Sequence, residues 1–123
     1  MNIWLLSGAV FGLLSVALGA FGAHALKETL DVYSKEIYEK AVLYQMFHAL
    51  ALLAVGILQK FYPQMSLHIS GWGFAIGILL FSGSLYVLAV TNAKWLGAIT
   101  PFGGLAYLAG WGWLIFVLLK ASE

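Results

Sequence analysis

The chain has 123 residues, of which 63% are hydrophobic and 9% are charged, whereas soluble domains carry roughly 25% charged residues. This composition predicts a single integral membrane domain over residues 1–123 and lies outside the range of ordinary soluble proteins. All six basic residues are lysines and the net charge is +1, so no basic patch predicts a nucleic-acid partner. The absence of cysteine excludes a thiolate nucleophile and a sulfur-ligated metal.

The first long apolar run covers residues 3–25. The tripeptide Ala23-His24-Ala25 imitates a signal-peptide cleavage site, so a removable signal peptide is the competing interpretation. The run is longer than the roughly 7 to 15 apolar residues of a signal peptide, and no lysine or arginine precedes it. We therefore expect a retained transmembrane helix.

Residues 26–40 form the polar connection between the first two spans. They hold most of the charged residues of the chain, while their apolar residues recur at helical spacing. The pattern predicts an amphipathic segment at the membrane interface, with a specific docking surface as the alternative. Ser34 is the expected N-cap, so we expect the second helix to begin near residue 34 and to enter the membrane near residue 41.

Residues 41–59 form the second span, which is about 28 Å long at about 1.5 Å per residue and reaches across most of a bilayer core. Gln45 and His48 lie within it and share a helical face with Ala41 and Leu52. Polar groups at this depth are costly in hydrocarbon, so both side chains are expected to face protein or a water-filled cavity.

Two further spans are predicted at residues 69–90 and 101–119. Pro63 ends the second helix, and Thr100 before Pro101 is typical of an N-cap followed by proline at the first helical position. Short connections between four crossings predict an all-α membrane protein, built as an antiparallel bundle of four transmembrane helices with both termini on one side.

Small residues recur along three of the predicted helices at spacings of three and four. Such stripes let helix backbones approach closely in lipid. We interpret them as packing surfaces within the chain, with a homo-oligomer interface as the alternative. The predicted packing residues are Gly8, Gly12, Ser15, Gly19, Gly22, Gly73, Gly77, Gly103 and Gly110.

The intramembrane polar residues fall in one half of the bilayer, next to the charged connection. They are His24, Tyr44, Gln45, His48, Ser82, Ser84, Tyr86, Asn92 and Thr100. Three interpretations are open: a structural hydrogen-bonded network, a proton or solute pathway, and a metal or haem site. Haem ligation by His24 and His48 is disfavoured, because their expected depths differ by about 10 Å.

No residue pattern predicts catalysis. The spacing of serine, aspartate and histidine suggests no triad, and the acids nearest a histidine, Glu28 and Asp31, lie in the solvated connection. We expect no enzyme activity, no cofactor and no bound metal.

The lysines near the membrane bear on orientation. Four of them, at positions 27, 35, 40 and 94, lie on the side of the charged connection, and two, at positions 60 and 120, lie on the side of the termini. Because cytoplasmic loops carry the excess of basic residues, we expect both termini outside the cytoplasm.

Four motifs occur in a recognisable order: Gly19-Ala20-Phe21-Gly22-Ala23-His24-Ala25-Leu26, residues 44–53, Phe81-Ser82-Gly83-Ser84-Leu85-Tyr86 and Thr100-Pro101-Phe102-Gly103-Gly104. With them the chain resembles the YgdD-like family of small bacterial inner-membrane proteins. The resemblance covers nearly the whole chain. It implies four transmembrane helices, a retained first helix and the bacterial plasma membrane, but no reaction and no ligand.

The leading hypothesis is a small structural or accessory membrane protein in which the polar residues hold the bundle together. A transport or channel protomer with a one-sided polar vestibule is the rival. A lipid-binding module is a third hypothesis, and it predicts an apolar cleft near Tyr107 and Trp111.

Overall fold

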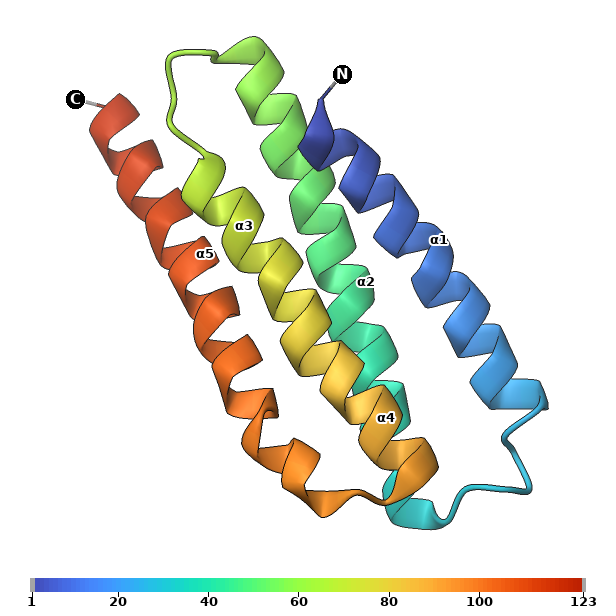
Figure 1. Cartoon of the computed structure of the whole chain (residues 1–123). Helices are drawn as coiled ribbons and strands as arrows, with labels where there is room; N and C mark the ends of the chain where they lie inside the picture. Colours follow the sequence, from blue (N-terminus) through green and yellow to red (C-terminus); the bar gives the residue numbers. More distant parts are fainter. Residues whose placement is uncertain (1, 123) are drawn as a thin grey trace.

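The computed structural model describes residues 2–122, and every regular element in that range is a helix (Figure 1). Four segments are long and apolar enough to cross a membrane, as the sequence predicts. The elements are α1 (Ile3–His24), α2 (Val32–Phe61), α3 (His68–Gly77), the π-helical η1 (Ile78–Ser82), α4 (Gly83–Thr91), the 3₁₀ helix η2 (Lys94–Ala98) and α5 (Thr100–Ala121).

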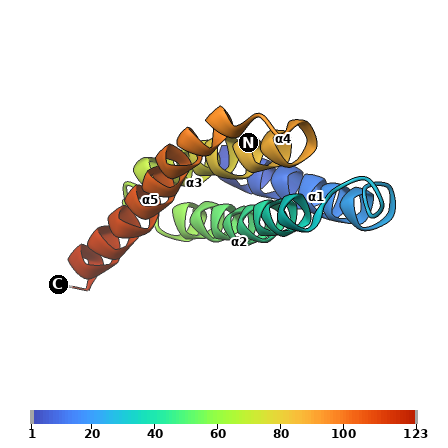
Figure 2. The same cartoon turned by 90° about the horizontal axis from the view of Figure 1, so that it is seen from below.

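The spans form an antiparallel bundle in which α2 and the α3–η1–α4 span are the inner members. The first helix α1 packs mainly against α2, and α5 packs mainly against α3 and η1. The two views agree that α1 and α5 lie on opposite sides of the inner pair (Figures 1 and 2). Both ends of the chain lie at the same end of the bundle, opposite the connection between α1 and α2 (Figure 1).

The second helix begins earlier than the sequence predicted. Asp31, rather than Ser34, is the N-cap, and its carboxylate accepts a hydrogen bond from the Ser34 amide at 2.7 Å. This bond lowers the pKa of Asp31, because it stabilises the charged carboxylate. The expected interfacial segment is therefore mostly the first turns of a 30-residue α2, and only the short stretch before Val32 is non-helical.

The third and fourth spans differ from the expected regular helices at one point each. The third is interrupted by η1, where the Gly83 amide bonds to the Ile78 carbonyl, as in the π-bulges that occur within α-helices. In the fourth, Thr100 is the first helical residue and its side chain caps nothing. The N-cap prediction for Thr100 was wrong because its hydroxyl has a partner on another helix.

The interior of the bundle is mainly apolar, and much of the outer surface is also apolar. Leu52, Val55 and Phe74 are fully buried, whereas Leu13 and Leu108 are 70% and 68% exposed. A soluble protein would not leave such residues in water at this density. Their exposure fits a surface that faces lipid.

Glycines allow the helices to approach closely where α5 meets η1. A Cβ atom added at Gly103 would lie 2.3 Å from the Phe81 backbone nitrogen, whereas one added at Gly104 would meet no atom within 4 Å. The backbone of η1 therefore occupies the space that a side chain at position 103 would need.

Gly103→Ala is predicted to lower the free energy of unfolding by about 1 to 3 kcal/mol, because α5 must move away from η1. Gly104→Ala, one residue further along the same helix, is the matched control and should change it by less than about 0.5 kcal/mol. Unfolding in mixed detergent micelles, followed by circular dichroism, measures both. Equal losses for the two variants would contradict the close packing of α5 on η1.

Candidate functional site

Gln45 is at the centre of the polar residues in the membrane. Its side chain is 2% exposed. The amide nitrogen donates to the Phe11 carbonyl of α1 at 2.9 Å, and the amide oxygen accepts from the Tyr86 hydroxyl of α4 at 2.6 Å. The Gln45 side chain of α2 thus connects α2 to α1 and α4 by hydrogen bonds between uncharged groups.

His48 lies one helical turn further into the membrane and is 6% exposed. Its Nε2 accepts a hydrogen bond from the Trp111 indole of α5 at 3.0 Å, and its Nδ1 lies 2.7 Å from the Tyr44 carbonyl. Since Nε2 is an acceptor, Nδ1 carries the proton and donates it to that carbonyl. Both ring nitrogens of a neutral imidazole are thereby satisfied by protein.

Aromatic rings enclose the imidazole. The His48 and Tyr107 rings stack with their centroids 3.6 Å apart and their planes within 10°. Trp111 and Phe74 pack on other sides of His48. These rings cover most of the surface of the imidazole.

Serine hydroxyls connect the third span to α2 and to α5. Ser82 of η1 donates to the Ala41 carbonyl of α2 at 2.7 Å. The Ser84 hydroxyl lies 2.6 Å from the Thr100 hydroxyl, which connects α4 to α5. Ser70 of α3 donates to the Gly110 carbonyl of α5 at 2.8 Å. Three of these four serine and threonine residues were predicted members of the polar set, and Ser70 was not.

The other predicted polar residues lie at the margin of this network. His24 is exposed at the end of α1, and Asn92 is exposed at the end of α4. Asn92 has a positive φ of 58°, which ends α4, and its side-chain oxygen lies 3.5 Å from the Ser34 hydroxyl. Tyr44 is 38% exposed and contributes its backbone carbonyl to His48.

The small-residue stripe of α1 faces α2 over most of its length. Added Cβ atoms at Gly8 and Gly22 would collide with Ala49 and Tyr38, and one at Gly19 would lie 3.3 Å from Val42, whereas Gly12 has open space. Ser15 is buried against the sulfur of Met46. In the third span and α5, Gly73, Gly77, Gly103 and Gly110 sit where α3 and η1 cross α5.

Two residues that the sequence pattern did not single out complete the contact between α1 and α2. The Tyr38 hydroxyl donates to the Leu18 carbonyl at 2.6 Å, and the side-chain amide of Asn2 donates to the Gly56 carbonyl at 2.9 Å. Tyr38 lies seven residues before Gln45, on the same helical face. The helical periodicity that relates Gln45 and His48, extended toward the N-terminus, would have identified Tyr38.

The network has little chemical reactivity of its own. Within residues 2–122, the buried side-chain atoms without a hydrogen-bond partner are the Tyr107 hydroxyl and the Gln59 amide oxygen. No group of three histidine, aspartate or glutamate residues lies close enough to hold a metal ion in the part of the chain that the structure describes. What the geometry supplies is hydrogen bonding between helices.

Comparison with known proteins assigns the chain to a family. A family model described as "Protein of unknown function (DUF423)" matches residues 18–104. The chain belongs to the DUF423 family. It is 42% identical over 120 residues to the UPF0382 membrane protein SH2409 of Staphylococcus haemolyticus and 41% identical over 121 residues to the UPF0382 membrane protein YwdK of Bacillus subtilis, and each match covers 98% of both chains.

No solved structure matches the chain. The relatives are named as membrane proteins of bacteria, which agrees with the four spans of the structure. The protein is therefore a membrane protein of the DUF423 family, and the biochemical function of this family is unknown.

The bond between Gln45 and Tyr86 is predicted to contribute a measurable coupling between α2 and α4. A double-mutant cycle of Gln45→Leu and Tyr86→Phe should give a coupling free energy of about 1 kcal/mol, within the range of membrane hydrogen bonds. The matched cycle of Gln45→Leu with Tyr62→Phe, whose hydroxyl belongs to an exposed residue at the far end of α2, should be additive to within about 0.5 kcal/mol. Additivity in both cycles would contradict the assignment.

Proposed function

We propose that this DUF423 protein is a structural or accessory component of the membrane, and that its polar residues serve to hold the helices in one arrangement. The observation that supports this proposal most strongly is the pairing of Gln45, whose two amide atoms bond to α1 and α4. A side chain used at both ends for helix contacts is not free to bind a solute.

The environment of His48 supports the same proposal. A proton relay needs a nitrogen that can exchange protons with water or with a neighbouring acid or base. Here one nitrogen accepts from Trp111 and the other donates to a backbone carbonyl. Moving a proton through this imidazole would break both bonds.

Several finer points belong to the proposal. We assign the protein to the bacterial plasma membrane. We also assign it to the YgdD-like group, which its four motifs resemble, and we expect it to have no enzyme activity. The four lysines on the side of the α1–α2 connection against two on the side of the termini favour termini outside the cytoplasm. Contact with the bilayer follows from the apolar outer surface.

Self-association through small residues is the second interpretation of the stripes. Most of the stripe on α1 is already covered by α2, but Gly12 on α1 and Gly104 and Gly112 on α5 have open space beside them. A homo-oligomer would use these positions, because close backbone approach is what small residues permit in lipid.

A transport or channel protomer is the rival function. The observation in its favour is the Tyr107 hydroxyl, which is buried near Ser82 and meets no hydrogen-bond partner of good geometry within residues 2–122. A water or a solute could supply its partner. The third hypothesis, a lipid cleft beside Tyr107 and Trp111, is weakened by the stacking of His48 on Tyr107 and the packing of Phe74 on Trp111.

His48→Ala is predicted to lower the free energy of unfolding by about 2 to 4 kcal/mol, because it removes the stacked ring and leaves the Trp111 indole unpaired. Thermal unfolding in detergent measures the loss. His68→Ala, at an exposed position, is the matched control and should leave the melting temperature unchanged.

The same two variants and the parent protein, reconstituted in liposomes, distinguish the proposal from its rival. The parent is expected to show no proton, cation or small-metabolite flux above that of empty liposomes. Flux in the parent protein that His48→Ala abolishes, together with unchanged melting of that variant, would overturn the structural proposal in favour of transport.

A further inference from the structure

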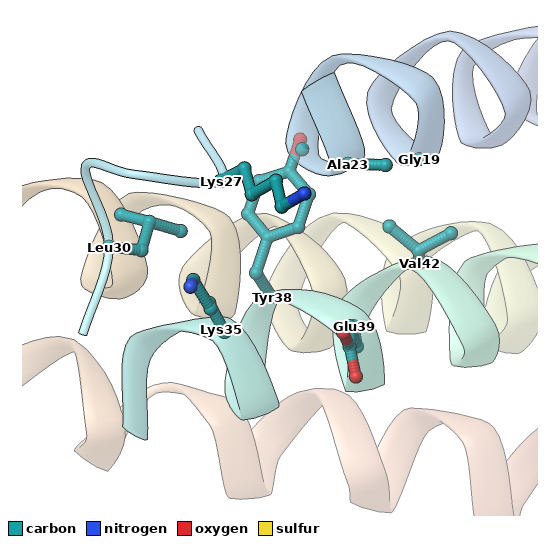
Figure 3. A pocket seen from close by; sticks show the side chains of 9 residues that line it. Gly19, Ala23, Lys27, Leu30, Lys35, Tyr38, Glu39 and Val42 are labelled. Atoms are coloured by element: carbon teal, nitrogen blue, oxygen red, sulfur yellow. The ribbon is translucent and has the colours of Figure 1, made fainter. Parts of the chain in front are cut away.

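A pocket of about 410 Å³ lies between the end of α1, the connection that follows it and the first turns of α2 (Figure 3). The volume falls within the roughly 300 to 1,000 Å³ of typical small-molecule sites. Its walls carry two lysines at one end and are mainly apolar at the other, where Glu39 lies on the side of Val42 (Figure 3). The residues that give it this character are Gly19, Gly22, Tyr38, Val42, Lys27 and Lys35.

The apolar end is built by missing side chains on α1. A Cβ atom at Gly22 would lie 2.3 Å from the Tyr38 ring, so the ring lies directly against the helix backbone. The Tyr38 hydroxyl is held by the Leu18 carbonyl, and the residue is 5% exposed. A Cβ atom at Gly19 would lie 3.3 Å from the Val42 side chain, so α1 and α2 are close together at this level. The pocket forms an apolar groove beside this contact.

The cationic end is formed by two lysines from different parts of the chain. Lys27 extends over the pocket from the α1–α2 connection, and Lys35 extends from the first turns of α2 on the side of Leu30 (Figure 3). Glu39 is the acidic residue among the lining residues, so the lining carries an excess of one positive charge. Glu28, Asp31 and Glu36 belong to the same stretch of sequence but do not line the pocket.

The position of the pocket relative to the membrane indicates the class of ligand that fits it. It lies where α1 ends at His24 and α2 begins at Val32, at the level where apolar spans give way to charged residues. A ligand here meets ammonium groups at the membrane surface and an apolar groove just below them. Anionic phospholipids have that same order of chemistry, and basic pockets between transmembrane helices bind their headgroups.

We propose that this pocket binds one anionic phospholipid, with the phosphate between Lys27 and Lys35 and the upper part of one acyl chain in the groove beside Gly19 and Val42. A free phosphate would use the lysines and leave the groove unused. This proposal does not depend on the structural role assigned to Gln45 and His48.

Native mass spectrometry of the full chain in detergent, titrated with phosphatidylglycerol or with zwitterionic phosphatidylethanolamine, tests the proposal. Phosphatidylglycerol is expected to bind with one tight site per chain. The double variant Lys27→Gln/Lys35→Gln should weaken that binding about thirty-fold, from about 1 kcal/mol for each lysine near an anionic lipid. Lys60→Gln/Lys120→Gln, with the same charge change at the opposite end of the bundle, is the control and should leave the tight site in place.

A second variant separates the groove from the charges. Ala23 is exposed and lines the pocket, so Ala23→Leu should fill the groove and weaken phosphatidylglycerol binding while both lysines remain. Glycerol phosphate should compete poorly; if it competes as well as the lipid and Ala23→Leu has no effect, the site is one for a free anion and the lipid proposal fails. Equal affinity for the two lipids, or equal losses in the two double-lysine variants, would also overturn it.

Discussion

The hydrogen bonds of Gln45 are the interaction on which the arrangement of the helices depends most. In a bilayer no water is present to satisfy a buried amide, so protein groups must do so. The side chain of Gln45 meets this requirement with a carbonyl of α1 on one side and a hydroxyl of α4 on the other. Because an unsatisfied amide would be costly, the two contacts fix the positions of both helices around α2.

The same requirement explains why α2 is the central helix. It contacts α1 through Tyr38 and Gln45, and it contacts α5 through His48. Apolar side chains gain little by leaving lipid for protein, so close packing at glycines and hydrogen bonds carry the association of the helices. The long exposed apolar surface is then free to face the bilayer. No charged side chain is needed inside the membrane for this arrangement.

The sequence predicted the residues of the network better than it predicted their partners. Gln45 and His48 could be placed inward because they share a face with apolar residues of α2. Their partners include the carbonyls of Phe11 and Tyr44, and every residue has a carbonyl, so no sequence pattern distinguishes these. The sequence analysis named Trp111 only as part of an apolar cleft and not as a partner of His48, since tryptophan is common on lipid-facing surfaces.

The helix ends show where local rules were insufficient. Ser34 and Asp31 can both cap a helix. In the structure Asp31 is the cap, while Ser34 is buried and its hydroxyl makes a tertiary contact with Asn92. Thr100 has the local pattern of an N-cap, but its hydroxyl pairs with Ser84. His24 was predicted to belong with the polar residues of the membrane, but its side chain is exposed at the end of α1, since position along a helix does not specify the direction of the side chain.

The most direct test of the central claim is hydrogen–deuterium exchange of side-chain protons by NMR in lipid nanodiscs. A dry, fully paired network predicts that the Gln45 amide and Trp111 indole protons exchange far more slowly than the indole proton of Trp95, which is exposed in η2 at the membrane surface. Exchange of Gln45 and Trp111 at the rate of Trp95 would show that water reaches the network, and would contradict a structural role for it.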